Sequence, residues 1–241
     1  YGTEKFAPGF TREFLEQATA ALPDTFFVAE PGEDALAARR ELFDVIFDPT
    51  VLPKRVNQAD GVDLVQTSAC NFYEGVTQRE VEDYYARMRA GATDEAPSFG
   101  LNSKLVKAGG QLGELTYTAS GLYAPAIRQI VMWLNRAAEV AENAEQRRVI
   151  ALLVDYYTTG NLQTFDQYSI EWLKEQRGQI DFINGFIEVY GDPLGLKGSW
   201  EGIVEYKDME ATRRTRTISD NAQWFEDHSP VDARFRKQKV T

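Results

Sequence analysis

Four segments in the middle of the chain carry apolar residues at intervals of three and four, which places those residues on one face of a helix. The first covers residues 77–88 and opens with Thr-Gln-Arg-Glu, a capping box. The second covers 124–141, and the third lies between Asn143, a capping residue, and Gly160, which can end a helix. The fourth covers 164–177 and opens with Thr-Phe-Asp-Gln, which predicts a similar cap.

The period of the apolar pattern changes to two after residue 180. Residues 180–190 and 200–206 alternate between apolar and polar side chains and predict two strands. Residues 208–225 return to a helical pattern. Upstream, the stretch 1–53 is rich in prolines and contains one short amphipathic helix around Phe14. Helices followed by paired strands and a further helix predict an α+β fold.

The first predicted strand ends in a mixture of apolar and chemically active side chains. Alternation would turn Ile187 and Val189 into a core and present Phe186, Glu188 and Tyr190 on the opposite face. A carboxylate and a phenol on one exposed face, followed by a Gly-Asp-Pro turn, indicate polar groups directed into a cleft. The alternative is a half-buried strand whose Glu and Tyr are only solvated.

Composition excludes several classes of function. The chain has 241 residues and a formal net charge of −11, whereas a nucleic-acid binder needs clustered Lys and Arg for the phosphate backbone. An acidic protein can attract cationic ligands, including the amino terminus of a peptide. Apolar runs stay well short of the roughly twenty residues of a membrane span.

Candidate catalytic residues of the common kinds are scarce. The sequence contains one histidine, His228, and one cysteine, Cys70, so a zinc site built from His and Cys cannot be completed. A His-Glu-x-x-His motif, a phosphate-binding loop and a Gly-x-Ser-x-Gly motif are all absent. His228 sits in a Glu-Asp-His-Ser-Pro cluster that is typical of a helix end, so we expect a capping or surface role for it.

Several longer segments resemble the dipeptidyl peptidase III family of zinc metallopeptidases. The segment Asn-Gly-Phe-Ile-Glu-Val-Tyr-Gly-Asp-Pro-Leu-Gly at 184–195 is similar to the strand that lines the family's substrate cleft. Segments 49–57, 100–107 and 221–227 are similar to the bacterial branch of the family and occur in the family's order. The likeness extends over nearly the whole chain.

The resemblance implies a two-lobed enzyme that releases dipeptides from the amino terminus of short peptides. One lobe would bind the peptide with helices and a small, partly open, barrel-like sheet. The other would carry Zn²⁺ on a His-Glu-x-x-Gly-His helix, which this sequence lacks. The chain would therefore be a fragment, without a metal site or bound zinc of its own. Residues 1–208 would belong to the peptide-binding lobe, and 209–241 would lead into the missing zinc-binding lobe, its expected partner.

The resemblance also assigns roles to individual residues. Glu188 matches the acid that binds the free α-ammonium of the peptide. Tyr190 matches the catalytic phenol that donates to the scissile carbonyl oxygen. Ile187 matches a residue that borders the substrate, although alternation turns it away from Glu188. Gly191 departs from the animal enzymes, which have an arginine at this place.

Two other classes of function remain open from the sequence. One is a non-catalytic peptide-binding module derived from the same lobe. The other is a metal-independent hydrolase that uses two carboxylates, Glu188 and Asp192, although an Asp before Pro193 is typical of a turn. We expect a soluble protein, cytoplasmic in preference to periplasmic, that binds neither nucleic acid nor membranes.

Overall fold

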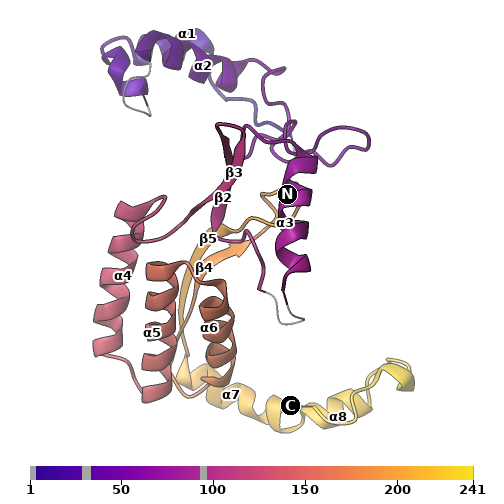
Figure 1. Cartoon of the computed structure of the whole chain (residues 1–241). Coiled ribbons are helices and arrows are strands. Elements are labelled where there is room, and N and C mark those ends of the chain that lie inside the picture. Colours follow the sequence, from indigo (N-terminus) through magenta and orange to yellow (C-terminus); the bar gives the residue numbers. More distant parts are fainter. Residues whose placement is uncertain (1–3, 29–33, 93–96, 241) are drawn as a thin grey trace.

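The computed structural model describes residues 4–28, 34–92 and 97–240, and these form a mixed α+β fold, as the sequence predicts. In chain order the elements are α1 (Arg12–Ala18), η1 (Asp24–Phe27), α2 (Ala35–Phe47), β1 (Tyr73–Glu74), α3 (Gln78–Ala90), β2 (Ser103–Ala108), β3 (Gln111–Thr116), α4 (Ala124–Glu139), α5 (Ala144–Thr159), α6 (Leu162–Lys174), β4 (Ile180–Glu188), β5 (Ser199–Tyr206), α7 (Met209–Asp220), α8 (Ala222–Asp227) and η2 (Ala233–Phe235). Figure 1 shows α4, α5 and α6 side by side along β4 and β5, with α3 beside the smaller strands.

The strands form two small open sheets. In the first, β1 pairs parallel with β2, and β2 pairs antiparallel with β3 from Ser103 opposite Thr116 to Ala108 opposite Gln111. In the second, β4 and β5 form an antiparallel pair with Ile180 opposite Tyr206. Within the described residues neither sheet closes into a barrel.

Local capping signals place most helix ends as predicted. The Thr77 hydroxyl accepts from the Glu80 amide while the Glu80 carboxylate accepts from the Thr77 amide, so the capping box of α3 is complete. Asn143 caps α5, which ends at Gly160 with a φ of 75°. Glycine adopts this left-handed conformation without steric cost. The start of α3 and both ends of α5 are therefore determined by residues close to them in the sequence.

Helix α6 begins earlier than the sequence pattern predicts. Its cap is Asn161, whose side chain accepts from the amides of Gln163 and Thr164, so Thr164 lies inside the first turn. Because α5 ends at the residue before this cap, the two helices follow each other without a linker. The predicted start at Thr164 is therefore wrong, and α6 also ends at Lys174, before Arg177.

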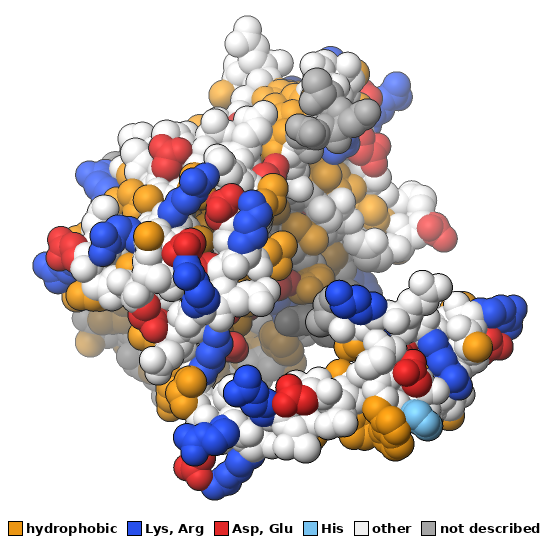
Figure 2. Space-filling model, turned by 90° about the horizontal axis from the view of Figure 1, so that it is seen from below, with side chains coloured by type: hydrophobic (Ala, Val, Ile, Leu, Met, Phe, Trp, Pro, Cys, Tyr) orange, Lys and Arg blue, Asp and Glu red, His pale blue; other side chains and the backbone are white. Residues whose placement is uncertain are grey.

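The predicted final helix is two helices. The helix α7 begins next to Asp208, close to the predicted start, and Asp208 caps it. It ends at Asp220, and the side-chain amide of the following residue, Asn221, donates to the Thr217 carbonyl at 2.7 Å. That bond satisfies one of the last carbonyls of α7 and favours a break, after which α8 continues to Asp227. In Figures 1 and 2 the two helices form an arm that extends away from the body of the molecule.

The sequence pattern did not predict α2, nor the hairpin of β2 and β3. Helix α2 buries only Phe43. The hairpin turns at Gly109 and Gly110, which have φ values of 58° and 80°. Two consecutive positive φ values are what a tight antiparallel turn requires, and a Gly-Gly pair supplies them.

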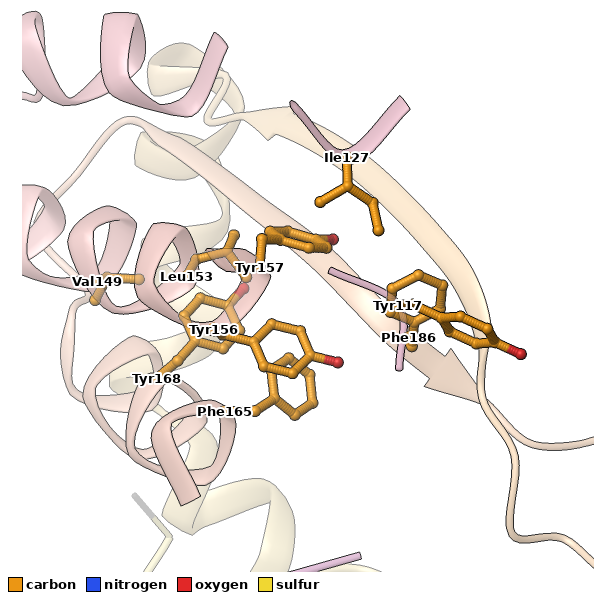
Figure 3. Packing of buried hydrophobic residues seen from close by; sticks show 9 residues of the cluster. All are labelled: Tyr117, Ile127, Val149, Leu153, Tyr156, Tyr157, Phe165, Tyr168 and Phe186. Carbon is orange, nitrogen blue, oxygen red and sulfur yellow. The ribbon is translucent and has the colours of Figure 1, made fainter. Parts of the chain in front are cut away.

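The described residues bury two hydrophobic clusters. The first lies between α4, α5, α6 and β4 and is rich in aromatic rings (Figure 3). Its buried members are Tyr117, Ile127, Val149, Leu153, Tyr156, Tyr157, Phe165, Tyr168 and Phe186. The second lies between α3 and β2 and contains Val65, Val76, Val81, Tyr85 and Leu105. Leu194 and Leu196 pack against the second cluster, so the turn after β4 connects both cores.

Candidate functional site

The end of β4 departs from the regular strand that the sequence predicts. The strand stops at Glu188, so Tyr190 lies in the turn that follows. A bulge interrupts the ladder: Phe186 pairs with Trp200, but Glu188 pairs with the preceding residue, Ser199. One extra residue on the bulged strand reverses the faces beyond it, so simple alternation no longer predicts which way the later side chains point.

Of three side-chain directions predicted from simple alternation, the structure shows that two are wrong and one is right. Phe186, expected on the face of Glu188, has 6 % of its surface exposed and belongs to the aromatic core. Ile187 packs against that core, as predicted. Val189, predicted to point into the core, instead lines a surface cleft together with Glu188 and Tyr190.

The cleft has a volume of about 670 Å³ and lies at the end of β4. It is lined by Arg55, Val56, Gln58, Glu188, Val189, Tyr190, Gly191, Asp192, Pro193, Leu194, Gly195 and Ser199. The structure therefore brings Glu188 and Tyr190 together, while Ile187 lines a separate apolar hollow with Trp172 of α6. Tyr190 is 63 % exposed, so its side chain is accessible to a ligand.

Two charged residues at or beside this cleft, Glu201 and Arg55, were not predicted as site residues from the sequence. Partial burial and the neighbouring carboxylate of Glu188 raise the pKa of Glu201, which lies on the adjacent strand β5. Two interacting carboxyl groups favour a cationic ligand, because a positive charge relieves their mutual repulsion. Arg55, which lines the cleft whereas Glu201 does not, holds its guanidinium over the Phe6 ring at 5.5 Å from the centroid.

Only the pairing of β4 with β5 brings Glu201 towards Glu188, so no local sequence signal could have found it. Arg55 is different, because it falls within the segment 49–57 that contributes to the family resemblance.

Asp192 holds the turn after β4 and does not offer its carboxylate to the cleft. One carboxylate oxygen, Oδ2, accepts from the Tyr73 hydroxyl at 2.8 Å and from the amides of Leu196 and Lys197 at 2.7 and 2.9 Å. The other, Oδ1, accepts from the Leu194 amide at 3.2 Å. With only 3 % of the residue exposed, this geometry supports the role of a turn residue and not a paired catalytic acid.

Other candidate residues lie outside the cleft. His228 caps α8, with its Nδ1 at 2.8 Å from the Trp224 carbonyl and its ring stacked on the Trp224 indole, which agrees with the predicted capping role. Cys70 is half-buried, and burial raises the pKa of its thiol. Across residues 4–28, 34–92 and 97–240, no three His, Cys, Asp or Glu side chains gather closely enough to hold a metal ion.

None of the helices described here is long and apolar enough to cross a membrane.

Comparison with known proteins identifies relatives of the chain. The sequence model of peptidase family M49 matches residues 70–241. The mouse protein "Dipeptidyl peptidase 3" is 28 % identical over 90 % of this chain and 30 % of its own length, and the human one is 25 % identical over 99 % of this chain and 35 % of its own length. The chain thus spans about a third of these relatives. The solved structure of DPP III from Caldithrix abyssi has the same fold, with a TM-score of 0.56 and 16 % identity over 95 % of this chain and 41 % of that one.

Proposed function

Since this chain belongs to peptidase family M49, we propose that it forms the peptide-binding portion of a zinc-dependent dipeptidyl peptidase, an enzyme that releases dipeptides from the amino terminus of short peptides. The observation that carries the proposal is that Glu188 and Tyr190 line the same open cleft. The two side chains have complementary chemistry for a peptide end, because one binds a cation and the other donates a hydrogen bond.

Glu188 is the group that would bind the free α-ammonium of the substrate. A carboxylate and an ammonium form a charge-assisted hydrogen bond, which is roughly twice as strong as a neutral one. Burial and the neighbouring Glu188 raise the pKa of Glu201, so a second carboxyl group lies beside Glu188. A peptide with a blocked amino terminus lacks the positive charge, and this would explain a preference for free amino termini.

Tyr190 is the group that would donate to the scissile carbonyl oxygen. That oxygen gains negative charge as the bond is attacked, so a donor placed there stabilises the transition state more than the substrate. Ile187 faces the aromatic core and a neighbouring apolar hollow, so we assign it a bordering role, without direct contact to the scissile bond.

Zinc does not fit the residues of this chain. The described residues hold no cluster that could ligate it, and the sequence has one histidine. In the proposed enzyme the zinc ligands would belong to the zinc-binding lobe of the same polypeptide, outside this chain.

We further propose that residues 1–208 belong to the peptide-binding lobe and 209–241 to the connection with the zinc-binding lobe. The arm of α7 and α8 supports this division, because it extends from the body and exposes Met209, Ile218 and Trp224. Figure 2 shows an apolar patch on this arm among basic and acidic side chains. A covering lobe would remove that apolar surface from water.

The substitution Glu188→Gln tests the proposed contact in the intact enzyme. We expect KM for a dipeptide substrate to rise by about 10- to 100-fold, because a hydrogen bond to a charged group is worth roughly 1.5–3 kcal/mol. Since the contact exists in both the ground state and the transition state, kcat should change little. The loss in kcat/KM should be much smaller for a peptide with an acetylated amino terminus.

The matched control for this test is Glu205→Gln, an exposed glutamate on the same strand as Glu201. Steady-state kinetics of both variants should show the rise in KM only for Glu188→Gln. Equal losses on free and acetylated peptides would remove Glu188 from the ammonium site.

The isolated chain of 241 residues should bind no stoichiometric zinc and release no dipeptide. The reason is the ligand count given above, since a catalytic zinc site needs three protein ligands. Metal analysis after gel filtration and a fluorogenic dipeptide assay would measure both. Dipeptide release that persists in excess chelator would favour a metal-independent hydrolase instead.

A further inference from the structure

Lys197 is a charged residue with 0 % of its surface exposed. It lies in the turn after β4, at the point where the chain leaves the cleft and enters β5. Lysines are almost never fully buried unless their ammonium group is paired, so each such case requires partners.

The ammonium of Lys197 reaches three elements that lie about a hundred residues earlier in the chain. It donates to the hydroxyl of Tyr85 on α3 and, at 3.1 Å, to Oγ of Ser103 on β2. Glu114 on β3 accepts from the same two hydroxyls, at 2.7 Å from Tyr85 and 2.5 Å from Ser103, and lies 3.8 Å from the ammonium. The rings of Tyr85 and Tyr73 also face the cation, at 4.6 and 5.8 Å.

The backbone of Lys197 is held at the same time. Its amide donates to Asp192, whose carboxylate also accepts from the Leu196 amide and from the Tyr73 hydroxyl on β1. The next amide, that of Gly198, donates to the Leu101 carbonyl at 2.8 Å. The segment from Asp192 to Gly198 is thus tied to α3 and to all three strands of the small sheet, and Tyr190 lies two residues before its start.

Stability alone does not account for the buried ammonium of Lys197 and its partners. Burial lowers the pKa of Lys197 to about 8, even though the carboxylates of Glu114 and Asp192 favour its charged form. Well-packed apolar residues often stabilise a protein as much as a buried ion pair or more, so what the pair supplies here is a defined geometry.

We propose that Lys197, together with Asp192, is a positioning residue of the peptide site: it fixes the turn after β4 and thereby the Tyr190 hydroxyl. The inference rests on the function proposed above for Tyr190. It differs from that function because Lys197 is fully buried and is not among the residues that line the cleft.

Hydrogen exchange of the chain tests whether Lys197 holds the turn. In Lys197→Met, which replaces the ammonium side chain with an uncharged one of similar length, the amides of residues 191–198 other than Pro193 should exchange about tenfold faster or more. Lys107→Met is the matched control, because Lys107 lies on β2 and pairs with Glu80 at the surface. If Lys197→Met does not fold, Lys197→Met with Glu114→Gln removes the ammonium together with the carboxylate 3.8 Å from it. Unchanged exchange at 191–198 would overturn the inference.

A double-mutant cycle in the intact enzyme tests whether the anchor acts through Tyr190. Lys197→Met should lower kcat about tenfold when Tyr190 is present and less than about twofold in the Tyr190→Phe background. Lys107→Met should leave kcat unchanged in both. An equal loss in both backgrounds would reduce Lys197 to general structural support and overturn only this inference. An unaltered kcat in Tyr190→Phe alone would overturn both the proposed role of Tyr190 and the catalytic part of the inference.

Discussion

Replacing Tyr190 by phenylalanine in the intact enzyme is expected to lower kcat about 10²-fold and to leave KM nearly unchanged, because loss of one oxyanion donor typically has this effect. The phenol would act on charge that develops only as the carbonyl is attacked, so the ground state should not register its loss. Phenylalanine keeps the ring in the cleft and removes only the donor. Steady-state kinetics on a dipeptide substrate separates the two constants.

Tyr206→Phe provides a matched control, since Tyr206 is 83 % exposed at the end of β5 and lies outside the cleft. Its kcat should equal that of the unmodified enzyme. If Tyr190→Phe changes kcat by less than a factor of about two, the oxyanion role is wrong. A rise in KM with constant kcat would instead place Tyr190 among the groups that bind the ground state.

The second large effect is expected from alkaline pH, which should unfold the isolated chain near pH 11. Burial raises the pKa of Tyr84 above the usual value and shifts six further tyrosines more strongly, among them Tyr168, whose pKa is raised to about 12. The other five are Tyr73, Tyr85, Tyr117, Tyr156 and Tyr157. In the unfolded chain these phenols ionise near pH 10, so above that pH the folded state binds more protons than the unfolded state.

The sign follows from this difference in bound protons. Stability contributed by a group with a raised folded pKa is fully present below pH 10 and is lost as the pH rises. At pH 11 each such tyrosine costs on the order of 1 kcal/mol, so the set together removes several kcal/mol from a typical total of 5–15 kcal/mol. Lys197 acts in the opposite direction between about pH 8 and its unfolded value of 10.5, because its folded pKa is lowered.

Far-ultraviolet circular dichroism and tyrosinate absorbance at 295 nm would follow the transition together. The buried phenols should ionise only as the helices are lost, so the two signals should share a midpoint. Tyr117→Phe removes one raised pKa and should move the midpoint to slightly higher pH, whereas the exposed-site control Tyr206→Phe should have a smaller effect. A chain that keeps its helical signal well above pH 11 would contradict the prediction.

Residues close in sequence determined the parts of the fold that were predicted correctly. The capping box at Thr77, the cap at Asn143 and the left-handed Gly160 each act on amides or carbonyls within about four residues. The family resemblance likewise came from continuous segments, and the family comparison confirmed it.

The tertiary structure alone decided which way the site residues point. The bulge between Phe186 and Glu188 arises from pairing with β5, and it sends Phe186 into the core while Glu188 and Val189 line the cleft. Glu201 approaches Glu188 through the same pairing. Tyr190 falls outside the strand, so its position depends on a turn that Lys197 ties to α3 and the small sheet.

These contacts join residues separated by up to 112 positions, and no local pattern encodes such a pairing. The sequence by itself determined the α+β class, the helix caps and the pair Glu188 and Tyr190 as candidates, because short-range hydrogen bonds and recognisable segments specify them. The orientation of the site was decided by burial and strand pairing, because a buried ammonium and a bulged ladder obtain their partners only when distant segments have come together.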